Sequence, residues 1–497
     1  MAISTAIDPS AIASVTGVKT TYKNLAAGNT FYLPQRAIIV GQGATASTYS
    51  TTKAQYFDAF SVGQAYGFGS PVHLAALQLL PTNGDGVGTI PVTVYPLDDD
   101  GAGVAAAGDI TPTVGTIVQA SYKVVVNNIE SEPFVVEVGD AVADVIDKMV
   151  TAVNAVVEMP VIASDGTTTL DLACKWKGSS GNDLYLEVTG RTDAGMTWAY
   201  TQPTGGLNNP DVTTATDQIG NVWETMAVNC MEIADTDNLD VFSTVNEGKW
   251  LPTVTRPMVV FTGNTATTVA SAITVPDARK TDRTNGQLVD PGSNDLPFVT
   301  AARQLARIIK VANVNPPVDY VGQQATGLTP GLDSAQWSDA EKNAAILGGS
   351  STAESIDGVT TIGDVVTFYH PTGDPLPPWR HVKDIVRMQN IIFNLGLIFN
   401  AVEWKSAPLV PDDQSVRNPA ARQPKDAVAA VAALTDSLAA DAIISDPASA
   451  KKTIAAEIDS QNPNRLNVTV TYALTGNTKT KSVDFNFGFY FGGAAAA

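Results

Sequence analysis

Two runs of residues near the C-terminus alternate between apolar and polar side chains. The apolar face of the first run holds Leu466, Val468, Val470, Tyr472 and Leu474, and that of the second holds Val483, Phe485, Phe487, Phe489 and Phe491. A period of two is typical of a half-buried β-strand, and the Thr475-Gly-Asn477 turn between the runs predicts a hairpin. Because an isolated hairpin is marginal in water, either the rest of the chain or another chain must cover this face.

Length and charge limit the classes of protein to which the chain can belong. At 497 residues it is long enough for two to four domains, and its 44% hydrophobic content can fill sizeable cores. The net charge of −20 argues against nucleic acid and against anionic membranes as partners. The charge does not exclude a partner that presents basic patches.

Cysteine content and apolar runs indicate where the chain is made. Cys174 and Cys230 are the only cysteines, which is too few for a disulfide framework. The N-terminal sequence has neither a basic region nor an apolar core typical of a secretion signal. The longest apolar run, 391–402, is too short to span a bilayer. We expect a soluble protein assembled in a reducing cytoplasm.

The order of expected elements predicts an α/β fold with an inserted, mainly β domain. A strand at 37–40, helices at 53–60 and 73–80 and a strand at 90–95 suggest an α/β unit with a parallel sheet. Further along, helices are expected at 142–157, 299–311, 379–404, 426–440 and 449–460. We divide the chain into an extended arm (1–30), a first core part (31–100), an inserted β-rich domain (101–215), a second core part (216–360) and a C-terminal domain with the hairpin (361–497).

Three motifs invite a binding function, and their contexts argue against it. Gly41-Gln-Gly-Ala-Thr-Ala46 matches a loose dinucleotide-binding pattern, but a Ser/Thr run follows where a helix should begin, so we expect a tight turn. The acidic stretches 98–101 and 235–240 lack the ligand spacing and closing glutamate of an EF-hand, so we expect solvated loops.

No arrangement of residues predicts catalysis. The histidines are His73, His370 and His381, and none pairs in sequence with a nucleophile, although a triad assembled in space stays possible. No Gly-x-Ser-x-Gly elbow is present, and two cysteines with scattered histidines argue against a metal site. We expect no enzyme activity, no cofactor and no metal.

With chemistry absent, the ordered set of segments becomes informative, and it resembles the contractile tail sheath proteins of bacteriophages, closest to the sheath of Mu-like myophages. The segments are FYLPQRAIIVGQG, then YFDAFSVGQAYGFGSPVHLAALQLLPTNG, then LACKWKGSSGNDLYLEV, and finally VDFNFGFYFGG. The similarity lies in the ordered set of these segments and covers nearly the whole chain.

This resemblance implies a mechanical role. The family's core is called subtilisin-like for its fold, yet no matching Asp, His and Ser positions can be assigned here. Subunits would stack as hexameric rings around a tail tube and exchange terminal arms. A baseplate would trigger contraction, and the implied partners are further copies, the tube protein, and the baseplate and tail terminator proteins, all in the virion. Another virion structural protein or, less favoured, an α/β enzyme are the alternatives.

Two sets of residues are predicted to make contacts between subunits. Strand pairing between subunits is expected for Val18, Thr20, Tyr22, Val468, Val470, Tyr472, Val483, Phe485, Phe487 and Phe489. On the helix expected at 379–404, a basic stripe that continues to Asn390 and Asn394 lies opposite a broad apolar side. Its cations, Arg380, Lys383 and Arg387, are predicted to face an acidic tube, with a solvated surface as the simpler alternative.

Overall fold

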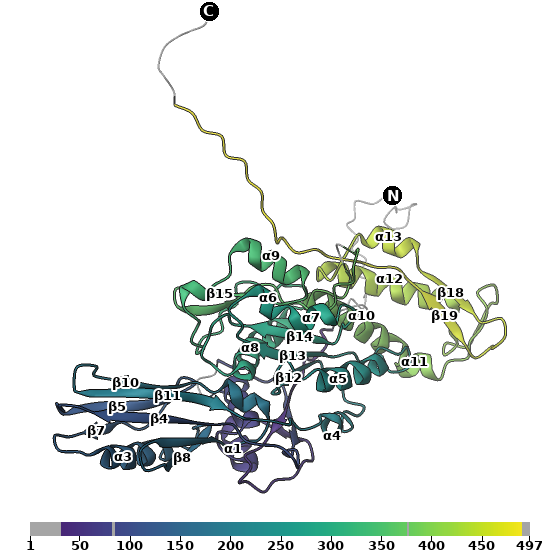
Figure 1. Cartoon of the computed structure of the whole chain (residues 1–497). Coiled ribbons are helices and arrows are strands. Elements are labelled where there is room, and N and C mark those ends of the chain that lie inside the picture. The colour runs from purple at the N-terminus through teal and green to yellow at the C-terminus, as the bar shows by residue number, and fades with distance from the viewer. Residues whose placement is uncertain (1–30, 82–84, 375–376, 490–497) are drawn as a thin grey trace, which may run out of the picture. The chain divides into compact units, whose positions relative to one another are not determined.

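The structure is a computed structural model that describes residues 31–81, 85–374 and 377–489 (Figure 1). The chain divides into two compact units. Of the described residues, the large unit takes 32–392 and those from 476 onward, and the small unit takes Phe31 and 393–475. Helix α10 (Val382–Phe399) contributes residues to both.

A six-stranded sheet with the order β14-β13-β12-β1-β3-β2 forms the base of the large unit. Its strands are β1 (Ala37–Gln42), β2 (Ala54–Tyr56), β3 (Val92–Leu97), β12 (Met226–Asn229), β13 (Val259–Asn264) and β14 (Asn285–Val289). All neighbours run parallel except β2, which is antiparallel to β3. The parallel strands are buried along their whole length, which explains continuous apolar runs such as 37–40. The predicted mixed α/β class is confirmed.

The helices of the large unit connect these strands, and α2 and α8 pack against the sheet. The helices before α10 and outside the region between β3 and β12 are α1 (Ala59–Tyr66), α2 (Pro71–Leu79), α5 (Thr236–Lys249), α6 (Val269–Ala272), α7 (Thr274–Ala278), α8 (Pro297–Val314) and α9 (Asp339–Leu347). A two-stranded hairpin, β15 (Ala353–Ile356) with β16 (Val359–Ile362), precedes α10. The helix predicted at 53–60 is wrong in its first half, because β2 occupies it and Asp58 accepts the Ser61 amide as the N-cap of α1.

Between β3 and β12 the chain forms two four-stranded antiparallel sheets and a helix, drawn in blue to teal in Figure 1. Their elements are β4 (Ala107–Val114), β5 (Ala120–Val126), β6 (Ile129–Glu130), β7 (Phe134–Val136), α3 (Val142–Asn154), β8 (Val161–Asp165), β9 (Leu170–Cys174), β10 (Leu186–Gly190) and β11 (Met196–Thr204). One sheet has the order β11-β4-β9-β8, and the other joins β10, β5 and β6, with β7 also on β5. The short helix α4 (Thr213–Thr216) then leads back to β12.

These sheets share a continuous apolar core with the six-stranded sheet. Trp176 is fully buried, and its ring lies edge-on to that of Phe298 in α8, with 6.1 Å between ring centres. Polar contacts add to this junction, since the Asn128 amide donates to the Asp295 carboxylate at 2.6 Å.

The small unit combines one long helix with two short strand pairs. After the end of α10 it contains α11 (Val402–Lys405), α12 (Pro424–Ala440), β17 (Ile444–Ser445), α13 (Pro447–Lys452), β18 (Ala455–Ile458), β19 (Leu466–Thr469) and β20 (Ala473–Leu474). The antiparallel pairs are β18 with β19 and β17 with β20. The helix predicted at 379–404 is therefore two helices, interrupted after Phe399.

The predicted C-terminal hairpin is wrong in its partner strand. The run that begins at Leu466 pairs with 455–458, and residues 483–489 form no strand. The helix predicted at 449–460 ends at Lys452, which releases 455–458 as a strand closer in sequence than 483–491. A turn supports this pairing, since the Asp459 N–H donates to the Arg465 carbonyl at 2.9 Å and the Asp459 carboxylate accepts the N–H groups of Gln461 and Asn462.

Candidate functional site

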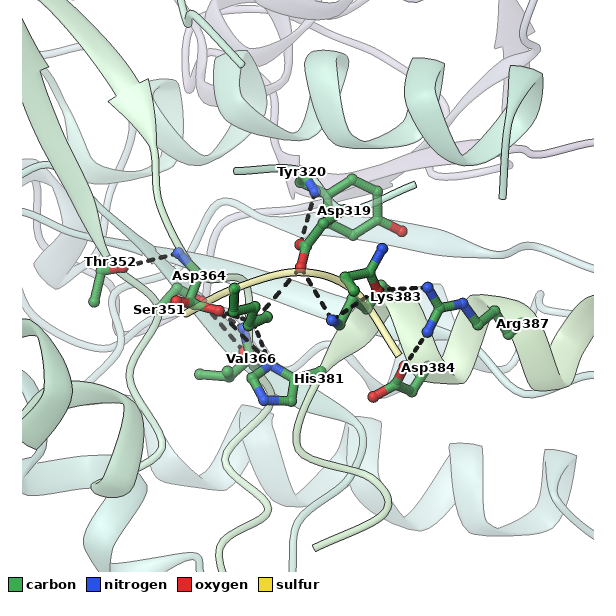
Figure 2. Close-up of polar contacts among 12 residues, drawn as sticks. Asp319, Tyr320, Ser351, Thr352, Asp364, Val366, His381, Lys383, Asp384 and Arg387 are labelled. Carbon is green, nitrogen blue, oxygen red and sulfur yellow. Dashed lines mark hydrogen bonds and ion pairs between the residues drawn. The ribbon is translucent and has the colours of Figure 1, made fainter. Parts of the chain in front are cut away.

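The site that the described residues support is a fixed point at which the C-terminal segment is held on the large unit. Figure 2 shows it, with the C-terminal segment as the yellow ribbon crossing the cluster. We call it the anchor cluster, and its members in the body of the large unit are Asp319, Asp364, His381, Lys383, Asp384 and Arg387. Two residues of the C-terminal segment, Asn477 and Lys479, contact it.

The first turns of α10 position the cations. Lys383 and Arg387 are four residues apart, so both lie on one face of the helix. Asp384 lies in the first turn, where a carboxylate is favoured by the helix dipole, and it accepts the Arg387 Nη1–H at 2.8 Å. Lys383 Nζ lies 3.0 Å from Asp319 Oδ2.

Asn477 inserts its side-chain amide among these groups. Its Oδ1 accepts from Lys383 Nζ at 2.8 Å and from Arg387 Nη2 at 2.5 Å. Its Nδ2 donates to the Pro317 carbonyl at 3.0 Å, and Arg387 Nη2 donates to that same carbonyl at 2.5 Å. One amide thus uses both its acceptor and its donor to fix the chain just after Gly476.

Lys479 makes a second contact two residues on. Its ammonium pairs with Asp364, lies 3.6 Å from Asp319 Oδ2 and lies 3.2 Å from His381 Nδ1. Asp364 is itself held, because its backbone N–H donates to Thr352 Oγ1 at 2.9 Å. Acidic and basic groups therefore alternate around the base of the segment, and each cation is close to a carboxylate or an amide oxygen.

Burial and neighbouring charges shift the titration of these groups. Burial is the main cause that lowers the pKa of His381 to about 4, and the nearby Lys383 charge adds to it. This imidazole is therefore neutral near pH 7. Burial alone would raise the pKa of Asp319, but Lys479 and Lys383 outweigh it and keep that pKa below its usual value. Burial lowers the pKa of Lys479, an effect that Asp319 opposes. Such an arrangement holds a chain segment and offers no activated nucleophile.

The prediction of an exposed basic ridge is wrong. Arg380, Lys383 and Arg387 are 6%, 5% and 0% exposed. The cations of α10 are covered by 317–320 and by the C-terminal segment, whose polar groups bind them. An amphipathic pattern distinguishes an apolar from a polar face, but it cannot show that another segment of the same chain covers the polar face.

The same polar stripe of α10 also binds the backbone of Phe31 and Leu33, which lie at the start of the described chain. In the large unit, Asn390 Oδ1 accepts from the Leu33 N–H at 2.8 Å. In the small unit, Asn394 accepts from the Phe31 N–H at 3.0 Å and donates to the Phe31 carbonyl at 2.8 Å. Within each unit, therefore, α10 holds backbone that adjoins a terminal region.

Among the described residues, those predicted to pair strands between subunits do not pair with one another within the chain. Val18, Thr20 and Tyr22 lie outside the described residues. Val468 lies in β19, Val470 follows it, and the Tyr472 hydroxyl lies 3.2 Å from Thr435 Oγ1 in the small unit. In the C-terminal segment the side chains of Val483, Phe485, Phe487 and Phe489 are 78–85% exposed.

The small unit contains a hollow, lined by both apolar and polar side chains, that the sequence analysis did not anticipate. Its volume is about 850 Å³. Leu466, Val468 and Val470, which share one strand face, line it together with Phe399 and Trp404. The alternation in the sequence identified the first three, but nothing in it showed which helix lies opposite. Nor did any local signal mark Asn477, Lys479, Asp319 and Asp364, because their roles arise only from tertiary contacts.

The remaining sequence motifs have structural roles. Gly41 and Gln42 end β1, and no helix starts in 43–52. Asp99 accepts from Gln42 Nε2 and from Thr45 Oγ1, each at 2.5 Å, and Asp235 is the N-cap of α5.

The histidines and thiols are also accounted for. His73 Nδ1 accepts the Gly69 N–H, and His370 Nδ1 lies 2.6 Å from the Phe368 carbonyl. Burial raises the pKa of both thiols, that of Cys174 to about 12. In the described chain no group of three or more His, Cys, Asp and Glu side chains is placed to hold a metal ion. No described helix is both long and apolar enough to cross a membrane.

Comparison with known proteins finds similarity to tail sheath proteins. No protein family model matches the chain. The chain is 28% identical over 171 residues to the Mu-like prophage FluMu tail sheath protein of Haemophilus influenzae, a match that spans 33% of this chain and only 34% of that relative. In fold it is similar to the sheath tail protein Lin1278 of Listeria innocua, with a TM-score of 0.50, 12% identity and coverage of 91% of this chain and 95% of that one. It is also similar, at a TM-score of 0.48 and 10% identity, to the PVC sheath complex of an extracellular contractile injection system in its contracted state, with coverage of 96% and 98%. The resemblance stated from the sequence is confirmed: the chain is similar to a tail sheath protein in sequence over the matched third, and to a sheath tail protein in fold over most of its length.

Proposed function

We propose that this chain is a structural subunit of a contractile tail sheath in a phage-like tail or injection particle. Copies stack as hexameric rings around a tail tube, and contraction drives the tube through the host envelope. The chain performs no chemistry, since the stored energy lies in two alternative sets of contacts between subunits. It is assembled in the host cytoplasm and ends in the virion, where its other partners are the baseplate and tail terminator proteins.

The observation that carries this proposal is the C-terminal segment. It is fixed at Asn477 and Lys479, and beyond them it exposes an alternating apolar face that includes three phenylalanines, none in a strand. An apolar strand-forming sequence left uncovered by its own chain is the pattern of a segment that adds to a sheet elsewhere.

The small unit offers a matching acceptor. In the described residues β19 pairs only with β18, so its other edge is available for a further strand. The hollow in the small unit, on whose wall Leu466, Val468 and Val470 present apolar side chains, lies on the same strand run. We propose that arms of neighbouring copies add to this sheet, with the N-terminal residues Val18, Thr20 and Tyr22 as a further strand.

Each part of the chain has its own role in this proposal. The two core parts (31–100 and 216–360) form a subtilisin-like sheath core, the insertion (101–215) faces the outside, and 361–497 forms the inner domain. Arg380, Lys383 and Arg387 are buried within the subunit, so they are not part of the surface proposed to face the tube.

Replacing Phe487 by Asp tests the arm. The substitution places a charge on the apolar face at a position that is 78% exposed in the subunit, so folding should be unaffected. We expect circular dichroism melting like that of the wild type and no long hollow polymers by negative-stain microscopy. Asn486→Asp adds the same charge on the opposite face and serves as the matched control, with polymers retained. Normal polymers from Phe487→Asp would contradict the proposal.

A further inference from the structure

Three cations converge on one loop at the C-terminal end of α5. Lys53 Nζ donates to the Gln218 carbonyl at 2.5 Å, and Lys249 Nζ donates to the Ile219 and Gly220 carbonyls at 3.1 and 3.3 Å. Arg256 Nη1 donates to Asn221 Oδ1 at 3.2 Å. We call Lys53, Lys249 and Arg256 the cation cluster.

This cluster keeps its positive charge in a chain whose net charge is −20. All its contacts above are to neutral oxygens, and none of the ion pairs in the described chain includes Lys53, Lys249 or Arg256. The charges also oppose one another, because burial and then the nearby Arg256 and Lys53 lower the pKa of Lys249. Carbonyl dipoles orient these side chains but do not neutralise them, so a positive potential remains at this end of α5.

Two carboxylates of α5, those of Asp240 and, in its last turn, of Glu247, are by contrast neutralised by ion pairs. Asp240 lies 2.7 Å from Arg279, and Glu247 lies 2.7 Å from Arg283. The uncompensated charge of this helix is therefore concentrated at its ends.

The N-terminal end of α5 has the opposite sign. A hollow of about 550 Å³ lies there, and its carboxylates are Asp100, Asp211, Glu232, Asp235 and Asp237. None of these carboxylates takes part in an ion pair with a described residue, and no lysine or arginine lines the hollow. Burial, and to a smaller extent the Glu232 charge, raises the pKa of the adjacent Asp183 to about 7.

We propose that the cation cluster is an interaction surface for a second copy of this chain, whose acidic hollow at the N-terminal end of α5 it contacts. The occupant is chosen by charge complementarity, since the five carboxylates and the three cations occur on every copy. This contact is additional to arm exchange and uses none of its residues.

The geometry favours a head-to-tail contact that repeats. α5 has 14 residues, so its two charged ends are about 20 Å apart. They lie at opposite edges of the sheet, because Glu232 follows the end of β12 while Arg256 precedes the start of the parallel β13. Unlike surfaces on opposite ends of a subunit form heterologous contacts, which build rings or open helical polymers. Repeated contacts between opposite charges would also offset the mutual repulsion of subunits that each carry −20.

Charge reversal in two separate full-length chains tests the contact. One chain carries Arg256→Glu and the other Asp237→Arg, at an exposed position. Each chain alone places like charges in the contact, so we expect its polymerisation threshold, measured by sedimentation at low salt, to rise at least tenfold. An equimolar mixture should polymerise near the wild-type threshold, because each chain then meets only the complementary end of the other. High salt should weaken wild-type assembly in the same direction, since it screens these charges.

Controls separate this contact from folding and from arm exchange. Arg417→Glu and Asp413→Arg make the same charge changes at exposed positions of the small unit and should leave the threshold unchanged. Arg256→Ala removes the charge without adding one and should give an intermediate threshold, even if Arg256→Glu folds poorly. The contact is overturned if the reversed chains polymerise like the wild type, if mixing restores nothing, or if mixing yields only closed dimers. Phe487→Asp in the same assay reports on arm exchange, so the two proposals fail through different variants.

Discussion

Arg387 is one of the largest fully buried side chains in the described chain, and it carries a charge. Its guanidinium binds Asp384, the Pro317 carbonyl and Asn477. Arg387→Glu would bury a carboxylate beside Asp384 and remove the donors that these oxygens require. We expect a loss of about 3–5 kcal/mol in the free energy of unfolding, measured by urea titration.

Arg387→Lys is the matched variant, because it keeps the charge but not the planar fork of donors. It should lose less stability than Arg387→Glu while still loosening the C-terminal segment, visible as faster hydrogen exchange at 477–480. Equal stability of Arg387→Glu and the wild type would show that this burial does not occur in solution.

A buried carboxyl gives a prediction for pH. Burial raises the pKa of Asp290 to about 7, against a hydrogen bond from Thr360, from an unfolded value of 3.8. Between these values the folded chain keeps a proton that the unfolded chain loses, so stability falls as pH rises from about 4 to about 7 and stays lowered above it. Asp290→Asn should raise the free energy of unfolding at pH 8 by up to about 4 kcal/mol, since the pKa of Asp290 rises from 3.8 to about 7 on folding, and should change it little at pH 4. The exposed Asp413→Asn is the control, and an unchanged pH profile in Asp290→Asn would contradict the raised pKa.

At the scale of elements, what the sequence predicted follows from how local each signal is. The buried strand at 37–40, the helix at 142–157 and the β-rich insertion were predictable because composition and period are properties of a few neighbouring residues. The strand that pairs with 466–469 could not be predicted. Its residues, 455–458, show no strong alternation, and only their pairing in the folded chain makes them a strand. The anchor cluster was missed for a related reason, since Asp319 and Lys479 are 160 residues apart (479 − 319).

The insertion is the element whose removal is most informative. Replacing 101–215 by a short Gly/Ser linker should leave a core that still polymerises, because the six-stranded sheet uses no strand from the insertion. Trp176 covers Phe298, however, so the deletion exposes an aromatic ring that is 2% exposed in the intact chain. We expect low soluble yield from the deletion alone and recovery when Phe298→Gln is added, measured by soluble expression and negative-stain microscopy. Failure of both to give soluble protein would make the insertion part of the core.

At the scale of the whole molecule, the described residues that build the folded cores differ from those proposed to make contacts between subunits. Buried apolar side chains fill the cores of the six-stranded sheet, the insertion and the α12 region. The apolar side chains from Val483 to Phe489, by contrast, are exposed. Segments that contribute little to a core can be lost without unfolding, yet each subunit depends on them for several contacts in a polymer. The polymer therefore gains stability through multivalency, and small changes in an arm have large effects on assembly.

The N-terminal arm gives the sharpest test at this scale. Removing residues 1–24 leaves the backbone contacts of Phe31 and Leu33 with Asn394 and Asn390 in place, so the truncated chain should fold with an unchanged melting temperature. It should nevertheless form no ordered polymer, because the strand expected around Val18, Thr20 and Tyr22 is gone. A chain in which 1–24 are replaced by Gly/Ser of equal length should fail in the same way, which shows that strand sequence matters and not arm length. Contractile sheaths of normal length from either chain, seen by electron microscopy, would rule out exchange of the N-terminal arm.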